Sequence, residues 1–239
     1  MRTLLRWLWW TVVALLALQL YFVGRIALMA LVDPQSTSFQ RSEMWRIATE
    51  KGQLRWRQQW VPYAQISDNL KRAVIASEDD AFANHDGVQW DAIEKAWQKN
   101  AKAEAQALQR ARSGRPAKVV GGSTITQQLA KNLLLSGERT LLRKGQEFVL
   151  TVLLEVLLGK QRILEIYLNN VEWGEGVFGA EAAAQHYFRK PAARLSAFEA
   201  ARLSVMLPRP KFFERLPNSA YLSGRAGTIV ARMGDAALP

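Results

Sequence analysis

Apolar residues dominate the first part of the chain. Trp7 to Gly24 is almost unbroken apolar sequence, and after Arg25 the run resumes from Ile26 to Val32. A helix needs about 20 apolar residues to cross the hydrocarbon core of a bilayer. The run is long enough, with the Arg25 charge reaching toward one face of the membrane. It predicts a transmembrane anchor.

Basic and aromatic residues beside this run indicate its orientation. Arg2 and Arg6 precede it, and positive charge is typical of the cytoplasmic side of a span. Several Trp residues stand near its start, as expected at a membrane interface. Two other interpretations remain open, a cleaved signal peptide and a buried core helix. No clear small-residue cleavage site follows the run, which favours the anchor.

Beyond Asp33-Pro34, apolar residues recur mostly at three- and four-residue spacing, which predicts helices. Gly and Pro are sparse, with 15 and 8 residues, and this also favours helix over strand. No β-hairpin signal stands out, and Gln35 to Ser42 is expected to be a short linker. The expected helices lie within 44–57 and over 66–77, 91–112, 143–158, 161–169, 180–188, 197–206 and 218–233, and a further helix begins at Ser123 or Thr124. Gly159 is expected to close the helix over 143–158. A capping box from Ser196 to Glu199 is expected to open the helix over 197–206, and Pro208 and Pro210 to stop it.

The charge of the chain indicates an anionic partner. The formal net charge is +11, which fits a nucleic acid, a lipid surface or a phosphate-bearing substrate. The Trp residues beside the apolar run favour the membrane over nucleic acid. There is no cysteine, so disulfides, thiolate metal sites and cysteine nucleophiles are excluded.

Glu78 is the first candidate catalytic residue. It ends an apolar helical stretch and is followed by Asp79 and Asp80. Neighbouring acids and a helix C-terminus both disfavour negative charge, which raises a carboxyl pKa. A raised pKa suits a general base that works near neutral pH. A solvated acidic turn is the alternative interpretation.

A second candidate site begins at Gly121-Gly122, where a ligand could approach the backbone closely. The following helix carries Ser123, Gln127 and Lys131 at four-residue spacing on one face, and its opposite face is apolar. Free N–H groups at a helix start suit an anion. Hydroxyls, amides and a cation together suit a sugar pyrophosphate, although an ordinary exposed face with capping residues fits the same pattern.

Carboxylates also recur on an otherwise apolar helix, with Glu147, Thr151 and Glu155 at four-residue spacing. A helix that is apolar on most faces is buried, and a buried carboxylate needs a partner. Glu147 is expected either to form a structural ion pair or to act in the site, and for Glu155 an ion pair with the following Lys160 or Arg162 is preferred. The candidate partners of Glu147 are Lys131, Arg139, Arg143 and Lys144.

Two weaker features complete the candidates. His85 could be a base, but beside Gly87 it is expected to shape the loop. The basic run Lys99 to Lys118 could grip an anionic lipid or nucleic acid, and a solvated face is the simpler interpretation. With two His and no Cys, a metal site would have to be built mainly from carboxylates.

Five segments resemble, in order and spacing, the five motifs of the bacterial peptidoglycan glycosyltransferases, glycosyltransferase family 51. Five motifs in order over roughly residues 66–210 are far more specific than any one alone. The chain ends soon after the fifth motif, so the resemblance is to the monofunctional members of Gram-negative bacteria and not to those with a transpeptidase domain. The segments are 76–87, 121–132 (GGSTITQQLAKN), 143–147 (RKGQE), 160–169 (KQRILEIYLN) and 199–208.

The resemblance implies an all-α, lysozyme-like glycosyltransferase domain with a small membrane-associated lobe, preceded by one transmembrane helix. It implies that glycan strands grow from lipid II, with inversion at C1 of N-acetylmuramic acid and release of undecaprenyl pyrophosphate. The expected segments are a cytoplasmic N-terminus (1–6), the anchor (7–32), a linker and membrane-proximal segment (33–65) and the glycosyltransferase domain (66–239).

The same resemblance assigns roles to individual residues. Glu78 would be the general base, and Glu147 the second catalytic carboxylate, which orients the pyrophosphate region or holds a divalent ion. No cofactor is required, and Mg²⁺ or Mn²⁺ is allowed. Gln146 departs from the pattern, since some members carry a cation there. The implied substrate-binding residues are Lys131, Arg139, Ser123, Thr124, Gln127, Gln128, Asn132 and Arg143.

The implied location is the bacterial inner membrane, with a single span, a cytoplasmic N-terminus and a periplasmic catalytic domain. The implied partners are lipid II, the growing glycan strand and anionic lipid. Other cell-wall synthesis or division proteins are allowed, and nucleic acid is not expected. Two competing hypotheses remain, a lytic glycosidase that cuts the same glycan with paired carboxylates and a basic, membrane-tethered scaffold without catalysis.

Overall fold

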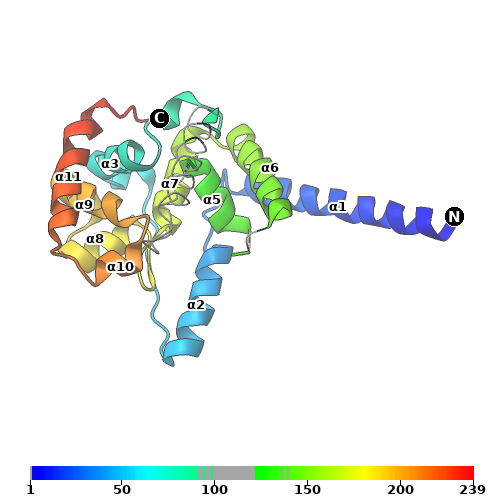
Figure 1. Ribbon diagram of the computed structural model, residues 1–239, viewed down its shortest axis with the longest axis horizontal. Coiled ribbons are helices and arrows are strands. Elements are labelled where there is room, and N and C mark those ends of the chain that lie inside the picture. The colour runs from blue at the N-terminus through cyan, green and yellow to red at the C-terminus, as the bar shows by residue number, and fades with distance from the viewer. Residues whose placement is uncertain (1, 91–93, 95–97, 99–121, 136, 139) are drawn as a thin grey trace, which may run out of the picture.

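The computed structural model describes residues 2–90, 94, 98, 122–135, 137, 138 and 140–239. The helix expected over 91–112, the basic run Lys99 to Lys118, Gly121 and Arg139 lie wholly or largely outside the described residues. The described part is mainly helical, as predicted, with one very small sheet (Figure 1). Its helices are α1 (Arg2–Leu28), α2 (Ser38–Lys51), α3 (Asp68–Glu78), α5 (Ile125–Leu134), α6 (Leu141–Leu157), α7 (Lys160–Asn170), α8 (Ala180–Phe188), α9 (Ala197–Met206), α10 (Pro210–Glu214) and α11 (Ala220–Arg232).

Helix α1 leaves the body beside α6 and projects away from it as one long helix (Figure 1). It has a mean hydropathy of 1.9 and is long and apolar enough to cross a membrane. Only 11 % of its apolar window is buried, so the core-helix interpretation is wrong. Near its base Phe22 and Ile26 are buried, and Gln19 and Gln146 of α6 exchange amide hydrogen bonds of 3.0 and 3.2 Å.

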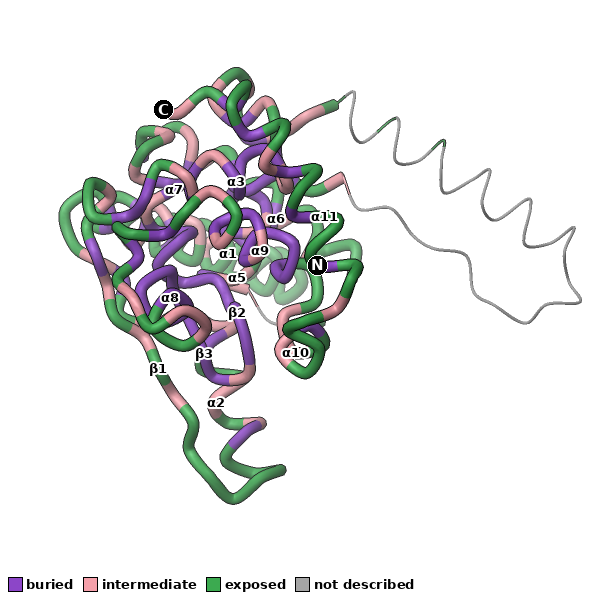
Figure 2. The backbone as a smooth tube through the Cα atoms, turned by 90° about the vertical axis from the view of Figure 1, so that its left-hand side faces the viewer, coloured by how far each residue is buried: buried purple, intermediate pink, exposed green. Residues whose placement is uncertain are grey.

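The core forms where the apolar faces of α3, α9 and α11 pack together. In α9 the small residues Ala200 and Ala201 are fully buried, which allows a close approach of the neighbouring helices. A capping box between Ser196 and Glu199 starts this helix, as the sequence predicts. Buried positions gather in the body around α3, α8 and α9, whereas the turn after α2 is exposed (Figure 2).

The structure contains a small hairpin, although no hairpin signal stands out in the sequence. β2 (Glu172–Gly174) and β3 (Val177–Phe178) are antiparallel, and β1 (Arg57–Gln58) pairs in parallel with β3. All residues of β2 and β3 are buried, so the strands lack the polar–apolar alternation by which a hairpin is recognised. The turn needs Gly176, which has φ of +72° and where a Cβ would lie 2.3 Å from the Arg55 carbonyl oxygen.

The linker expected from Gln35 to Ser42 is also wrong in its second half, because α2 begins at Ser38. Thr37 and Gln40 form a capping box, and the buried Gln40 side chain donates to the Asn170 carbonyl oxygen at 3.0 Å. A polar stretch therefore lies inside the body. Similarly, Gly159 does not close α6 but is the N-cap of α7, and Pro210 starts α10 instead of only ending α9.

Candidate active site

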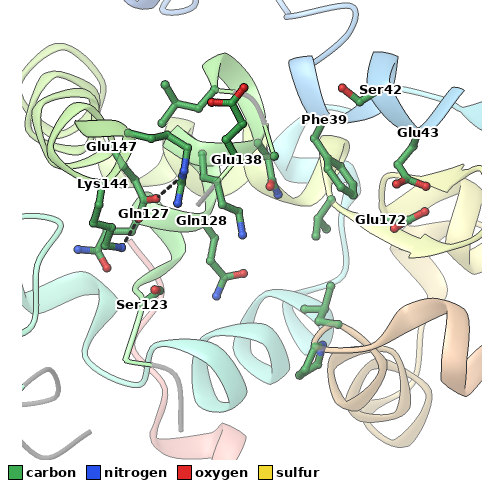
Figure 3. A pocket seen from close by; sticks show the side chains of 18 of the residues that line it. Phe39, Ser42, Glu43, Ser123, Gln127, Gln128, Glu138, Lys144, Glu147 and Glu172 are labelled. Atoms are coloured by element: carbon green, nitrogen blue, oxygen red, sulfur yellow. Dashed lines mark hydrogen bonds and ion pairs between the residues drawn. The ribbon is translucent and has the colours of Figure 1, made fainter. Parts of the chain in front are cut away.

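A cleft of about 610 Å³ opens between α2, α5, α6 and the sheet (Figure 3). Amides and cations of α5 and α6 line one end, and residues of α2, β2 and the segment after α9 line the other. Of the residues expected in the site, the cleft is lined by Ser123, Gln127, Gln128, Lys131, Asn132, Arg143 and Glu147.

Glu78 is the last residue of α3 and stands next to the cleft, although it is not among the residues that line it. Gln128 of α5 connects it to the cleft, since its amide Nε2 donates to Glu78 Oε2 at 3.0 Å. Burial raises the pKa of Glu78, and the hydrogen bonds from Gln128 and Ser77 only partly oppose this. The predicted direction is confirmed, but the main cause is burial, with the Asp79 charge a smaller contribution.

Tyr167 of α7 orients this amide from the other side. Its hydroxyl donates to Gln128 Oε1 at 3.0 Å, which leaves the Gln128 NH₂ group to face Glu78. Burial raises the pKa of Tyr167 well above its usual value, with the charges of Glu78 and Asp79 adding to the effect, so the phenol keeps its donor proton. A chain from Tyr167 through Gln128 to Glu78 therefore fixes the candidate base.

Asp79 holds the end of α3 against the start of α5. Its Oδ2 accepts the backbone N–H of Ile125 at 3.0 Å, and its Oδ1 lies 2.8 Å from His85 Nε2. Since His85 Nδ1 accepts from the Gly87 N–H at 3.0 Å, the ring proton lies on Nε2 and points to Asp79. This network supports the interpretation that His85 shapes the loop, and it brings Glu78 close to Gln128.

The start of α5 is built as a capped helix. Thr124 is the N-cap and forms a capping box with Gln127, and its hydroxyl donates to the Gly87 carbonyl oxygen at 2.6 Å. Thr124 and Gln127 thus act as capping residues that hold the loop and the helix together. Capping residues were the alternative interpretation of this helix face in the sequence. Ser123 lines the cleft directly, and the apolar stripe predicted opposite it is buried at Ile125, Leu129 and Leu133.

Glu147 is buried in α6 and carries two of the partners expected for it. Arg143 Nη1 lies 2.9 Å from one of its oxygens, and Lys144 Nζ lies 2.5 Å from the other. The buried Nε of Arg143 has no hydrogen-bond partner among the described residues, so it could serve a ligand. Figure 3 shows this group at one end of the cleft, close to Gln127.

Glu155 forms the structural ion pair predicted for it. Its Oε1 accepts from Lys160 Nζ at 2.8 Å and from the Thr126 hydroxyl at 2.6 Å. Arg162 is used elsewhere and donates to the Met29 carbonyl oxygen and to Asp33, each within 2.8 Å. These bonds tie the base of α1 to the globular part.

Comparisons with known proteins identify the family of this chain. The family model described as Transglycosylase matches residues 46–234. The chain belongs to this family. A biosynthetic peptidoglycan transglycosylase of Burkholderia thailandensis is 57 % identical over 95 % of the chain and 84 % of the relative. One of Herminiimonas arsenicoxydans is 52 % identical over 100 % of the chain and 99 % of the relative.

The chain is therefore a peptidoglycan glycosyltransferase with a mainly helical, lysozyme-like domain. The structure adds site residues that the sequence did not single out. Tyr167 and Asp79 position the candidate base, while Glu43 and Glu172 line the far end of the cleft. These four residues lie in or next to four different elements, so only the tertiary structure shows that they surround the site.

The divalent metal allowed at Glu147 stays a prediction. Both oxygens of Glu147 already accept from cations, so an added metal would have to displace Arg143 or Lys144. Within the described residues, no group of three His, Asp or Glu side chains could hold a metal ion. No step of the chemistry below depends on one.

Proposed function

We propose that this transglycosylase extends glycan strands from lipid II, with inversion at C1 of the donor N-acetylmuramic acid and release of undecaprenyl pyrophosphate. The observation that carries the proposal is the hydrogen bond between Glu78 and Gln128 at the edge of a cleft lined by cations. A carboxyl beside a row of amides and cations matches a reaction in which an alcohol attacks and a pyrophosphate leaves.

Glu78 is the general base in this proposal. The 4-hydroxyl of the acceptor N-acetylglucosamine loses its proton as the oxygen attacks C1, and an alcohol needs such assistance because it is a weak acid. Burial raises the pKa of Glu78 toward the working pH, which makes the carboxylate a better proton acceptor. The hydrogen bond from the Gln128 amide favours the ionised form of Glu78 and so limits the rise of its pKa.

The cations at the α5 and α6 end stabilise the leaving group. Lys131, Arg143 and Lys144 line the cleft, and cations near a departing pyrophosphate stabilise the charge that develops there. Glu147 orients Arg143 and Lys144 through its two ion pairs. The other proposed substrate-binding residues are Ser123, Thr124, Gln127, Gln128, Asn132 and Arg139.

The proposed location is the inner membrane, with residues 1–6 in the cytoplasm, an anchor over 7–32 and the enzyme domain in the periplasm. Besides α1, the start of α6 supports a membrane-facing side, because Leu141 and Leu142 are 91 % and 89 % exposed. Both belong to the helix that α1 contacts, so the cleft would open close to the lipid. Anionic lipid, lipid II and the strand are the proposed partners, with other cell-wall proteins allowed.

A lytic glycosidase fits this site less well. That chemistry uses two carboxyl groups that flank the scissile bond, one of them as an acid. Here both oxygens of the second carboxylate of the site, Glu147, are engaged by Arg143 and Lys144, so neither is placed to flank a scissile bond.

The test compares lipid II polymerisation by the full-length wild type and by Glu78→Gln in detergent micelles. Loss of a general base typically slows turnover by about 10²–10⁴-fold. Glu50→Gln is a matched control, since Glu50 is exposed on α2 and does not line the cleft. Polymerisation by Glu78→Gln within a few-fold of wild type would contradict the assignment, and shortening of polymeric glycan by the wild type would favour the lytic hypothesis.

A further inference from the structure

Helices α9, α10 and α11 lie at the end of the globular part opposite to the side from which α1 projects (Figure 1). Each of them presents an aromatic side chain to solvent, and Phe198, Phe212 and Tyr221 are 46 %, 44 % and 62 % exposed. A single exposed apolar residue needs no explanation, but several on neighbouring helices indicate an interaction surface. This surface is separate from the cleft, since none of the three residues lines it.

Two of these rings are joined through a buried one. Phe213 of α10 lies against the ring of Tyr221, with centroids 5.9 Å apart and ring planes 4° from parallel. The rings of Phe212 and Phe213 are 5.1 Å apart and packed edge to face. Because Phe213 belongs to the core, it holds Phe212 and Tyr221 at defined positions. Side chains that are already ordered lose little conformational entropy when a partner binds.

Arg202 connects α9 to the same surface. Its Nη2 donates to the Pro217 carbonyl oxygen at 2.7 Å, in the segment between α10 and α11, and its guanidinium lies 5.7 Å from the Phe188 ring centroid. Phe198 is one turn before Arg202 on α9 and therefore lies beside it. The exposed Leu216 precedes Pro217. The three helices thus share one surface of aromatic and apolar groups.

Each exposed ring of this surface has an arginine beside it. On α9 and α11 the arginine follows one turn after the ring, and beside α10 a guanidinium lies 4.6 Å from the ring centroid. None of these arginines forms an ion pair with a described residue. The pairs, which together with Leu216 are called the aromatic–arginine surface, are Phe198 with Arg202, Phe212 with Arg209 and Tyr221 with Arg225.

The carboxylates nearby do not neutralise these arginines. Glu199 of α9 pairs with Lys190 at 2.8 Å, and Glu214 of α10 accepts the Glu175 N–H at 2.8 Å. Glu181, the other acidic residue within 180–232, is buried. The aromatic–arginine surface therefore keeps its positive charge, and a partner that fits it must supply negative charge.

We propose that the aromatic–arginine surface is a docking site for an acidic segment of another protein, whose apolar side chains pack on the rings and whose carboxylates pair with the arginines. Phe, Tyr and Arg are enriched at protein interfaces, and Tyr and Arg often supply much of the binding energy there. Arginine can pair with a carboxylate through two parallel hydrogen bonds, which adds specificity. The partner segment lies on the same side of the membrane as the enzyme domain.

Charge and position argue against two other occupants. A second copy of the chain would place like charges opposite each other, which costs free energy at an interface. An anionic membrane would attract the arginines, but the surface lies away from α1, the helix that is apolar enough to enter a bilayer. An acidic protein segment meets neither difficulty.

The first experiment uses a phage library of random peptides of ~15 residues, about the length of an average helix. The library is depleted on full-length Arg225→Glu in micelles and then selected on the full-length wild type. Arg225 is exposed on α11, so its replacement should leave the Tm unchanged. The recovered peptides should be rich in Asp and Glu and should contain Trp, Phe or Leu.

Fluorescence anisotropy then measures the affinity of the recovered peptides for variants that played no part in the selection. Phe198→Ala, on a different helix, should weaken binding about threefold or more, because apolar contact area is lost from the same surface. Arg55→Glu is the matched control with the same change of charge as Arg225→Glu. Arg55 is exposed in the turn after α2, so this variant should bind as the wild type does.

The second experiment identifies the partner in the bacterium that makes the protein. A photoreactive phenylalanine analogue in place of Tyr221 should form an adduct with another protein. The segment of that protein in the adduct should be acidic. A synthetic peptide of that segment should bind the wild type and lose about tenfold or more of its affinity for Arg225→Glu, since attraction between opposite charges becomes repulsion.

Several outcomes would overturn the docking site. In the selection, these are recovery of no peptide, recovery of peptides without an excess of Asp and Glu, or equal affinity for Phe198→Ala and the wild type. In the cells, they are no adduct, or adducts only with lipid or with a second copy of the chain. Lipid II polymerisation is a separate readout, because Phe198 and Arg225 do not line the cleft and both variants should polymerise as the wild type does. Failure of the Glu78→Gln test would therefore leave the docking site standing.

Discussion

Replacing Glu172 by Gln should change how the stability of the protein depends on pH. The side chain is buried on the wall of the cleft, and burial raises its pKa from 4.5 to about 7. Between these two pH values the unfolded chain has released the proton while the folded protein keeps it. The folded state then binds more protons, so the free energy of unfolding falls as the pH rises toward 7.

The size of the effect follows from the two pKa values. Each pKa unit corresponds to ~1.36 kcal/mol, so the wild type loses at most roughly 3 kcal/mol through Glu172 between pH 4.5 and pH 7. The Gln variant cannot titrate and loses none of this. Roughly 2.5 kcal/mol of this loss falls between pH 5 and pH 8. For a chain of this size 1 kcal/mol corresponds to about 2–4 °C in Tm, so the variant should gain roughly 5–10 °C on the wild type over that interval.

The assay is thermal unfolding of both full-length proteins in the same micelles, followed by Trp fluorescence at pH 5, 6, 7 and 8. The difference at pH 5 serves as the baseline, because it contains the effect of exchanging a carboxylic acid for an amide. Glu50→Gln should follow the wild type at every pH, since Glu50 is exposed. A difference between Glu172→Gln and the wild type that stays constant from pH 5 to pH 8 would refute the reasoning.

Two further predictions concern the surroundings of Glu78. Tyr167→Phe removes the hydroxyl that orients Gln128, so the carboxylate loses support and the pKa of Glu78 rises. The rising limb of the pH–rate profile should therefore move to higher pH, and turnover at neutral pH should fall about 3–10-fold. A pH–rate profile identical to that of the wild type would contradict this role of Tyr167. Gly87→Ala should lower the Tm by a few degrees, roughly 1–3 kcal/mol, because φ is +83° and a Cβ would lie 2.8 Å from atoms of Thr151 and Glu155. Gly227→Ala is the control, with open space around it in α11, and a Tm as high for Gly87→Ala as for this control would contradict the strain.

Local signals in the sequence were sufficient for many of the helices. The capping box at Ser196 predicted the start of α9, and the apolar spacing predicted α8 with its observed bounds. Such signals work because the residues that decide them are three or four positions apart. They failed where polar residues are buried, as at Gln40 in α2, whose partner Asn170 is 130 positions away along the chain.

The site shows the same division. Glu78, Lys131 and Glu147 were predicted from their neighbours in the chain and from the family motifs. The raised pKa of Glu78 was predicted for a partly different reason, since neighbouring charge can be read from the sequence while burial cannot. Tyr167 orients Gln128 from a position 39 residues away along the chain and from a different helix, which no local pattern encodes.

By itself the sequence determined most of the helical segments, that the first helix is apolar enough to cross a membrane, and which family the motifs resemble, because periodicity, caps and motifs act over short distances along the chain. Only the tertiary structure decided that Gln128 faces Glu78, that Glu147 is locked between Arg143 and Lys144, and that Glu172 reaches the cleft with an oxygen free of hydrogen bonds to the described residues. Burial and pairing arise when distant segments exclude water from one another, so these properties belong to the folded arrangement and not to any stretch of the chain.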